Sequence, residues 1–414
     1  MRSEILVHLD NTRELEKMYR SNKSSFKRSF ALLYPEVRGN SVADCWNERL
    51  NYESDDISWG STKELLFVML ASLFAGLLAK LPALLSLNEE LFYTRNAGCI
   101  IFPILSAYFA WKNKLTLDKI IFISCITLVG ITFINALPVN SQSDTLILSC
   151  IHLVLFLWSI FGFSYIGEYS NNTDKRLSFL KFNGDLVVIC TLILIAGGIL
   201  TAITIGLFSL IGLDIRSFYF ENIVVFGLPA VPIFGCYLTQ TNPQLVSKVS
   251  PIIAKIFSPL VLVMLIVYLV AMVYSGKDPF TDREFLLIFN ALLIGVLALI
   301  FFSVSDSNNN SKSQFEIWTL VLLSIITIIV NGVALSAILF RISEWGITPN
   351  RVAVLGGNVL ILVNLFLITI QFLRVVSKRT DISSVGKVIS FYLPFYFAWT
   401  IIVTFLFPLI WNFK

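Results

Sequence analysis

The chain has 414 residues and a formal net charge of +4; 56% of its residues are hydrophobic and 14% are charged. Because soluble globular proteins are about one quarter charged, this composition excludes an ordinary soluble domain. The small charge, without a basic patch interleaved with aromatic residues, also argues against nucleic acid as a partner.

The apolar residues form continuous runs of roughly 18–25 residues, the length at which a helix crosses the ~30 Å hydrocarbon core of a bilayer. A transmembrane β-barrel requires alternating segments of ~10 residues instead. The sequence therefore predicts an all-α fold, a polytopic transmembrane helix bundle whose main partner is the lipid bilayer.

A polar tail, residues 1–62, precedes the first apolar run, which begins near Leu65. Asn11 and Thr12 can cap a short helix, and a second amphipathic segment is expected to stop before Pro35. The tail is too small for a large core of its own. We therefore expect a cytoplasmic helical cap on the membrane domain, with a partner-binding module as the alternative. The apolar positions of its helices are Leu15, Met18, Tyr19, Phe26, Phe30 and Leu33.

About eleven spans are predicted in a transmembrane domain of residues 63–414, and the pattern also allows ten or twelve. The second span is short and contains Pro103, and the sixth is interrupted by Pro229 and Pro232. The predicted limits are 65–84, 97–111, 118–137, 145–166, 186–210, 223–239, 251–274, 284–304, 317–339, 352–373 and 388–409.

The distribution of positive charge predicts the orientation, because cytoplasmic segments carry an excess of Lys and Arg. A cytoplasmic N-terminus assigns 23 of the 31 Lys and Arg residues to the inner side and 8 to the outer side. With an odd number of spans, the C-terminus is then external. The resulting prediction is a multi-pass protein of a plasma membrane.

No pattern in the sequence indicates a metal, a cofactor or a soluble catalytic motif. The six cysteines have no C-x-x-C spacing and five of them lie in apolar runs, which indicates buried hydrophobic side chains. His8 and His152 are too few for a histidine-based site. No phosphate-binding glycine loop, G-x-S-x-G or H-E-x-x-H occurs. We therefore expect no cofactor, and favour a protein that is not an enzyme.

The stretch 341–351, between the ninth and tenth spans, concentrates charge, an aromatic ring and turn formers at one membrane boundary. Gly346 can adopt a positive φ and end the preceding helix, and Thr348 or Asn350 can cap the next one. One interpretation is thus a tight helical hairpin with a structural ion pair between Arg341 and Glu344, which are three residues apart on one helix face, and with Trp345 at the membrane interface.

The other interpretation of this stretch is a polar binding site at the outer mouth. Arg351 can bind a phosphate or a carboxylate with two parallel hydrogen bonds. The candidate binding residues of the stretch are Arg341, Glu344, Trp345, Thr348, Asn350 and Arg351.

Uncharged amides also occur inside the apolar spans. Such side chains commonly bond neighbouring helices, and they can instead line the path of a solute. Gly356 and Gly357 would allow two helices to approach closely. The sequence leaves open whether the amides converge. They are Asn290, Asn331, Asn358, Asn364 and Gln371, of which Asn331, Asn358 and Asn364 are candidate binding residues.

The sequence R-I-S-E-W-G-I-T-P-N-R-V-A-V-L-G-G-N at 341–358 resembles the signature of a family of bacterial polytopic membrane proteins, a domain of unknown function. The stretch 252–304 and the tail around 15–20 and 46–52 are similar to that family as well. Trp345 stands where the family often has tyrosine, so its signature is R-x-x-E-[WY]-G-x-T-x-N-R. The resemblance implies a bacterial inner-membrane protein, and it brings no reaction or residue role.

Three functions remain open. The first is a carrier of a small polar or lipid-like anionic solute, with a cavity between the eighth, ninth and tenth spans. The second is a structural or regulatory protein whose tail binds a cytoplasmic partner through its apolar side chains. The third is a membrane-embedded transferase acting on a lipid-linked substrate, which would need clustered carboxylates. The carboxylates available for it are Glu89, Glu90 and Glu344.

Overall fold

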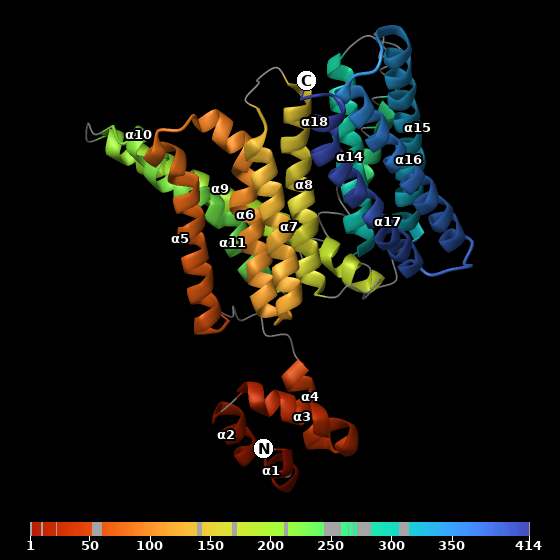
Figure 1. Cartoon of the computed structure of the whole chain (residues 1–414). Coiled ribbons are helices and arrows are strands. Elements are labelled where there is room, and N and C mark those ends of the chain that lie inside the picture. The colour runs from red at the N-terminus through yellow and green to blue at the C-terminus, as the bar shows by residue number, and fades with distance from the viewer. Residues whose placement is uncertain are drawn as a thin grey trace. The chain divides into compact units, whose positions relative to one another are not determined.

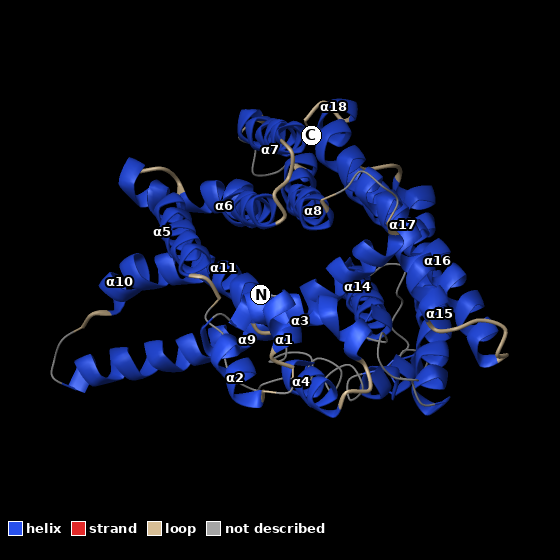
Figure 2. Ribbon diagram, turned by 90° about the horizontal axis from the view of Figure 1, so that it is seen from below, coloured by secondary structure: helices blue, strands red, loops and turns tan. Residues whose placement is uncertain are grey.

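In the computed structural model, all regular secondary structure of the described residues is helical (Figure 2). The chain divides into two compact units, Met1–Ile57 and Ser58–Lys414. The predicted boundary, between residues 62 and 63, lies five residues further along. The described residues are 2–9, 11–21, 23–51, 60–138, 143–167, 172–210, 214–243, 258–263, 265–267, 269–270, 283–305 and 314–413.

The N-terminal unit contains four helices with a small core of their own. Leu15 and Phe26 are fully buried, and Phe30 is 1% exposed. The tail was expected to be too small for a large core, and the core that it has is small: these side chains are buried against one another. The helices are α1 (Arg2–Val7), α2 (Thr12–Ser21), α3 (Lys23–Val37) and α4 (Ser41–Asn51).

Local signals explain the start of α2 but not the end of α3. The Asn11 side chain accepts a hydrogen bond from the Glu14 amide at 3.3 Å, as the capping prediction requires. In contrast, α3 continues through Pro35 to Val37, so the predicted stop before the proline is wrong. Pro35 lies in the last turn, where the single backbone hydrogen bond that it removes is easily replaced by water.

The second unit is a bundle of long helices (Figure 1). Its helices are α5 (Thr62–Leu85), α6 (Glu89–Lys112), α7 (Leu117–Ala136), α8 (Asp144–Ile166), α9 (Thr173–Leu210), α10 (Arg216–Tyr219), α11 (Val225–Thr241), α14 (Arg283–Ser305), α15 (Gln314–Trp345), α16 (Pro349–Val376), α17 (Ser383–Ile401) and α18 (Phe407–Ile410). Two π-helical segments, η1 (Phe220–Val224) and η2 (Ile402–Leu406), precede α11 and α18.

Eight helices of the described residues are long and apolar enough to cross a membrane. They coincide with eight of the eleven predicted spans, so the chain is a multi-pass helical membrane protein. Of the other three, 97–111 lies within α6, 284–304 lies within α14, and 251–274 lies largely outside the described residues. The eight are Thr62–Leu85, Leu117–Ala136, Asp144–Ile166, Thr173–Ala202, Arg216–Thr241, Gln314–Trp345, Pro349–Val376 and Ser383–Ile410.

The sixth predicted span is not interrupted. α11 continues through both Pro229 and Pro232. Proline is tolerated in membrane helices because neighbouring helices and local changes of helical pitch compensate for the lost backbone bonds. The irregularity lies instead upstream, in the π-helical segment η1.

Side-chain hydrogen bonds join the helix termini at one end of this bundle. Lys112, in the last turn of α6, pairs with Glu64, in the first turn of α5, at 2.9 Å. Lys119 of α7 donates to the Gly167 carbonyl, which ends α8, at 2.7 Å. Lys175, in the first turn of α9, donates to the Ile166 carbonyl at 3.4 Å. We call this end, defined by the three lysines, the lysine-rich end.

The opposite end of the bundle is joined in the same way. Arg95 of α6 donates to the carbonyls of Asn135 and Pro138, at the end of α7. Ser143, the N-cap of α8, donates to the carbonyl of Phe413 at 3.0 Å. The C-terminus thus lies at the end of the bundle opposite the start of α5, as Figure 1 shows.

Candidate functional site

The turn between α15 and α16 is built as the sequence predicted. Gly346 has a φ of +78° and follows the last residue of α15. The Thr348 side chain accepts a hydrogen bond from the Arg351 amide at 3.4 Å and caps α16, and Pro349 follows at the first helical position. A positive φ without a Cβ and an N-cap hydroxyl together make this tight hairpin.

Arg351 serves this turn directly. Its Nη1 donates to the carbonyls of Trp345 at 2.8 Å and Gly346 at 2.6 Å. These carbonyls belong to the C-terminus of α15, which has no further helical turn to satisfy it. This geometry supports the interpretation that Arg351 stabilises the helical hairpin, rather than the interpretation that it binds an anion.

Both arginines of the stretch lie near the same ring. The guanidinium carbons of Arg341 and Arg351 are each 5.7 Å from the centroid of the Trp345 ring, which is cation–π distance. Trp345 is 50% exposed, whereas Arg341 is 7% exposed. Glu344 is exposed and Asn350 is half-buried, so the six candidate residues form a turn and its surface rather than an enclosed site.

The amides of three helices converge within the bundle. The Asn358 amide nitrogen on α16 donates to the carbonyl oxygen of the Asn290 side chain on α14 at 2.9 Å. The Asn331 amide nitrogen on α15 donates to the backbone carbonyl of Asn358 at 3.2 Å. The structure thus answers a question that the sequence left open. We call these three residues the amide cluster.

One atom of the amide cluster has no partner. Asn331 is fully buried, and its side-chain oxygen Oδ1 accepts no hydrogen bond. A buried polar atom without a partner is rare in folded proteins and asks for an explanation. Asn358, at 3% exposure, has its nitrogen bonded to Asn290.

Asn364 lies on a different face of α16. It is fully buried, and its nitrogen donates to the hydroxyl of Tyr396 on α17 at 3.0 Å. Its oxygen also accepts no hydrogen bond. Of the three candidate amides, Asn331 and Asn358 therefore lie together with Asn290, whereas Asn364 bonds Tyr396 instead.

Sequence reasoning missed a second polar contact between α15 and α16. The hydroxyl of Thr369 donates to that of Ser324 at 3.0 Å, and both residues are buried. Ser324 lies seven residues before Asn331, and Thr369 lies eleven residues after Asn358. Both spacings are close to whole helical turns, so a search for polar residues at antiparallel positions of the hairpin would have found the pair.

A half-buried ionic group occupies the lysine-rich end. The Tyr108 hydroxyl and the Lys112 ammonium both donate to the same carboxylate oxygen of Glu64. The ammonium is also 3.1 Å from the Tyr108 hydroxyl. Because each polar group has a charged or hydroxyl partner, this group fastens α5 to α6.

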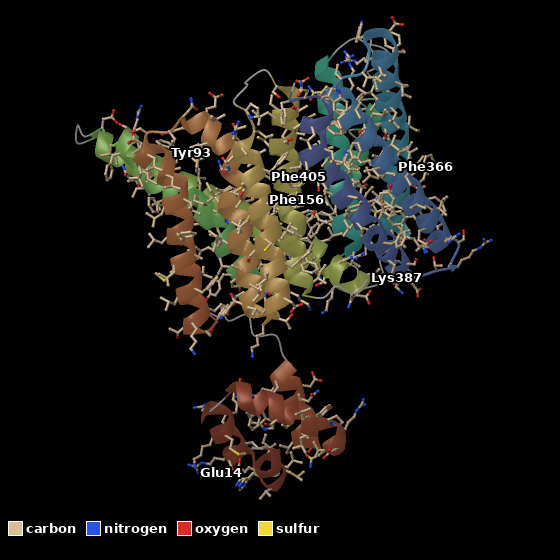
Figure 3. All side chains as sticks on the ribbon, in the orientation of Figure 1. Glu14, Tyr93, Phe156, Phe366, Lys387 and Phe405 are labelled. Carbon is tan, nitrogen blue, oxygen red and sulfur yellow. The ribbon has the colours of Figure 1, made fainter. Side chains whose placement is uncertain are left out.

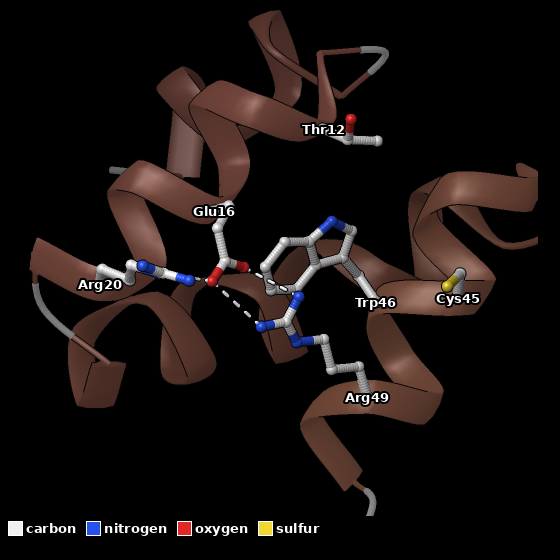
Figure 4. Close-up of a pocket in the computed structure, with 6 residues that line it drawn as sticks. All are labelled: Thr12, Glu16, Arg20, Cys45, Trp46 and Arg49. Carbon is white, nitrogen blue, oxygen red and sulfur yellow. Dashed lines mark hydrogen bonds and ion pairs between the residues drawn. The ribbon is translucent and has the colours of Figure 1, made fainter.

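The N-terminal unit has a small surface pocket of about 370 Å³ (Figure 4). Glu16 pairs there with Arg20 and Arg49, each at 2.8 Å. The Arg49 guanidinium lies 4.7 Å from the Trp46 ring centroid. Hydrogen bonds from Arg20, and then from Arg49, hold the pKa of the Glu16 carboxyl below its ordinary value. The pocket is thus closed on one side by an ion-pair network.

The other sequence predictions about sites are answered in part. Among the described residues, no three or more His, Cys, Asp or Glu side chains are grouped to hold a metal ion. Cys150 and Cys236 are buried as expected, whereas Cys125 is exposed on α7. Glu89 and Glu90 are exposed in the first turn of α6, where carboxylates favour the positive end of the helix dipole.

The fold and these contacts define an α-helical, multi-pass membrane protein with a buried amide cluster. Comparison of the chain with protein-family models, with curated proteins and with solved structures finds no match. Any further statement about its function depends on the contacts described above.

Proposed function

We propose that the chain is a carrier of a small polar solute and that the solute binds at the amide cluster. The observation that carries this proposal is the unpartnered Oδ1 of Asn331, inside the bundle at 0% exposure. In a carrier, a solute would supply the missing partner. Binding sites of many carriers lie between helices near the middle of the membrane.

Energetic considerations support a functional over a purely structural cluster. A hydrogen bond between membrane helices contributes about 0.6 kcal/mol on average. A buried polar atom left without a partner costs about 1–3 kcal/mol. The bond that Asn331 donates to Asn358 therefore does not offset the cost of its unpartnered oxygen. Leucine at position 331 would be the better residue if packing were its only role.

The free atoms also indicate the class of solute. In the amide cluster, the side-chain nitrogens of Asn331 and Asn358 each donate a hydrogen bond, whereas an acceptor, the Oδ1 of Asn331, has no partner. An acceptor favours a solute that donates hydrogen bonds or carries positive charge. The earlier expectation of an anionic solute rested on Arg351, whose Nη1 bonds the carbonyls at the end of α15.

The proposal includes the topology of a bacterial inner-membrane protein with eleven spans and a cytoplasmic N-terminus. α6 has 24 residues, about 36 Å of helix, which is enough to span a bilayer. The start of α5 and the C-terminus lie at opposite ends of the bundle, which supports an odd number of crossings. The family resemblance of 341–358 supports the bacterial membrane.

The alternative functions have less support. Leu15, Phe26 and Phe30 are buried in the core of the N-terminal unit, so they are not available to a partner as the regulatory hypothesis requires. The transferase hypothesis requires clustered carboxylates, and Glu89 and Glu90 are explained by the helix dipole.

The test compares the wild-type chain with Asn331→Leu and with the control Thr369→Val. The control removes a hydrogen bond from the same pair of helices without altering the amide cluster. Thermal unfolding of the purified proteins is measured with a panel of metal cations, amines, polyols and amino acids, followed by uptake into proteoliposomes.

We expect a donor-bearing or cationic solute to raise the unfolding midpoint of the wild type and of Thr369→Val, and not that of Asn331→Leu. The same solute should be taken up only by vesicles with the first two proteins. If every solute acts equally on all three folded proteins, the amide cluster is not a binding site and the proposal fails.

A further inference from the structure

The surface pocket of the N-terminal unit, about 370 Å³ in volume, is lined mainly by side chains that donate hydrogen bonds. This volume lies at the lower end of the range for small-molecule sites. Helices α2 and α4 supply its walls, and both belong to one compact unit. The lining residues are Thr12, Glu16, Arg20, Cys45, Trp46 and Arg49 (Figure 4).

Two guanidinium groups surround the single carboxylate of this lining. Nη1 and Nη2 of Arg49 lie 2.8 and 3.1 Å from the two carboxylate oxygens of Glu16. The ring centroids of Trp46 and Tyr19 lie 4.7 and 5.4 Å from the guanidinium carbon of Arg49 and fix its position. Arg20 bonds Glu16 through Nε at 2.8 Å, and its two Nη groups bond none of the described residues. The lining therefore keeps a net positive charge.

Trp46 adds a further donor to the pocket. It is 5% exposed, and its indole nitrogen, which faces the side of the pocket where Thr12 lies (Figure 4), donates to none of the described residues. Thr12 is the first residue of α2, where the helix dipole is positive and the first amides have no partner within the helix. Donors and positive charge thus lie around one volume, which favours an anion with several acceptor oxygens.

The carboxylates next to the pocket in the sequence face elsewhere. On α4, Asp44 accepts a hydrogen bond from the Tyr34 hydroxyl of α3 at 3.0 Å. This bond first, and the charge of Glu48 as a smaller cause, raises the pKa of the Tyr34 hydroxyl, so both carboxylates lie on the α3 side of α4. On α2, Glu14 pairs with Lys17 at 3.6 Å, at the periphery of the unit (Figure 3). Glu16 is therefore the carboxylate that opposes an anion in the pocket.

We propose that this pocket binds a small phosphorylated molecule whose phosphate group bonds Arg20 and Arg49. A guanidinium can bond two phosphate oxygens at once. A phosphate monoester carries a charge of about −1.5 to −2 at pH 7, more than a carboxylate does, so it competes with Glu16 for the two arginines. The site is independent of the proposed solute carrier, because it shares no residue with the amide cluster.

The two charges of the pocket should act in opposite directions. Arg20→Gln removes a cation that bonds the phosphate and should weaken binding, whereas Glu16→Gln removes the competing carboxylate and should strengthen it. Lys17→Gln is the matched control for Arg20→Gln, because it removes the same charge from the same helix. Lys17 is 77% exposed, and it does not line the pocket.

Wild type, Arg20→Gln, Glu16→Gln and Lys17→Gln are compared as full chains in detergent. Cys45 is exposed and lines the pocket, so a bound molecule should shield its thiol. Alkylation of this thiol by N-ethylmaleimide, an uncharged reagent, is followed by peptide mass spectrometry, which separates Cys45 from the other cysteines. The probes are phosphoserine, serine and sodium chloride, the last at matched ionic strength.

Phosphoserine should protect Cys45 of the wild type and of Lys17→Gln at the same concentration, whereas serine and sodium chloride should not protect it. Arg20→Gln should need about fivefold more phosphoserine, the upper end for one exposed ion pair, and Glu16→Gln about two- to fivefold less. If Arg20→Gln and Lys17→Gln need the same concentration, or if serine protects as well as phosphoserine, the proposal is overturned. This comparison decides the question even if Glu16→Gln fails to fold.

Discussion

Two adjacent glycines of α16 provide a sharp test of how α16 and α17 pack. A Cβ added at Gly356 would lie 2.2 Å from atoms of the Trp399 ring on α17. A Cβ added at Gly357 would meet nothing within 4 Å. Gly356→Ala and Gly357→Ala thus make the same chemical change one residue apart, in opposite surroundings.

The expected magnitudes differ in sign. Overpacking a well-packed contact costs about 1–3 kcal/mol, because a rigid ring or a helix has to shift. Alanine in place of glycine in a helix gains about 0.5–1 kcal/mol. Gly357→Ala retains only the gain and should be neutral or slightly stabilising. Gly356→Ala carries both terms, and we expect a net loss of about 0.5–2 kcal/mol, from the lower and upper ends of those two ranges.

Thermal unfolding of the two variants in the same detergent, followed by intrinsic fluorescence, measures their order. Gly356→Ala should unfold below the wild type and Gly357→Ala at or above it. Adding Trp399→Phe to Gly356→Ala should recover part of the loss, because the smaller ring leaves room for the methyl group. Equal midpoints for the two single variants would refute the close approach of α16 and Trp399.

Three further predictions concern polar contacts. Asn358→Leu should lower the free energy of unfolding by about 1 kcal/mol, the upper part of the range for amides between membrane helices. The reason is that the Asn290 side-chain oxygen loses its hydrogen-bond donor. Chemical or thermal unfolding measures this loss. Arg351→Ala should loosen the α15–α16 turn and speed its amide hydrogen exchange, whereas a ligand-binding role alone would leave exchange in the unliganded protein unchanged. For Glu16, whose folded pKa is depressed, the stabilisation from Arg20 is present above the unfolded pKa of about 4.3 and disappears as the pH falls through the folded pKa. Limited proteolysis should therefore cleave the N-terminal unit of Glu16→Gln faster than the wild type at pH 7, and equally fast at low pH.

The membrane architecture was predictable because its cause is local. A continuous apolar run of about 20 residues has one stable solution in a bilayer, so the ends of helices such as α7 and α8 agree with their predicted limits within a few residues. The continuity of α11 through Pro229 and Pro232 was not predictable in this way. It depends on neighbouring helices that compensate for the missing backbone bonds, and these are far away in sequence.

The site was predictable only in part. The turn at Gly346 and the cap at Thr348 follow from local conformational preferences and were found from the sequence. The pairing of Asn358 with Asn290 joins residues 68 positions apart, and depends on which faces of three helices meet. Periodicity in an apolar helix does not show these faces, because the lipid-exposed side is as hydrophobic as the packed side.

The core of the N-terminal unit escaped prediction for a related reason. Each of the four short helices has few apolar residues, and the sequence does not show that together they form a core. In the structure, Trp46 of α4 packs against Phe26 of α3 and Tyr19 of α2, with ring centroids 5.2 and 5.6 Å away. Large aromatic side chains allow a unit of this size to enclose a core.

The cations at the end of the bundle that carries the C-terminus show why residue type alone misleads about function. Lys80 donates to the Glu221 carbonyl at 2.6 Å, Arg95 to two carbonyls at the end of α7, and Arg351 to two carbonyls at the end of α15. A helix terminus in or near a membrane exposes carbonyls that water reaches poorly, so donors from nearby long side chains are required there. The positive-inside pattern predicts few cations at this end. These three donate to backbone carbonyls and so stabilise helix ends. The proposed solute site therefore rests on an acceptor left unpaired, the Asn331 oxygen, rather than on an arginine at a membrane boundary.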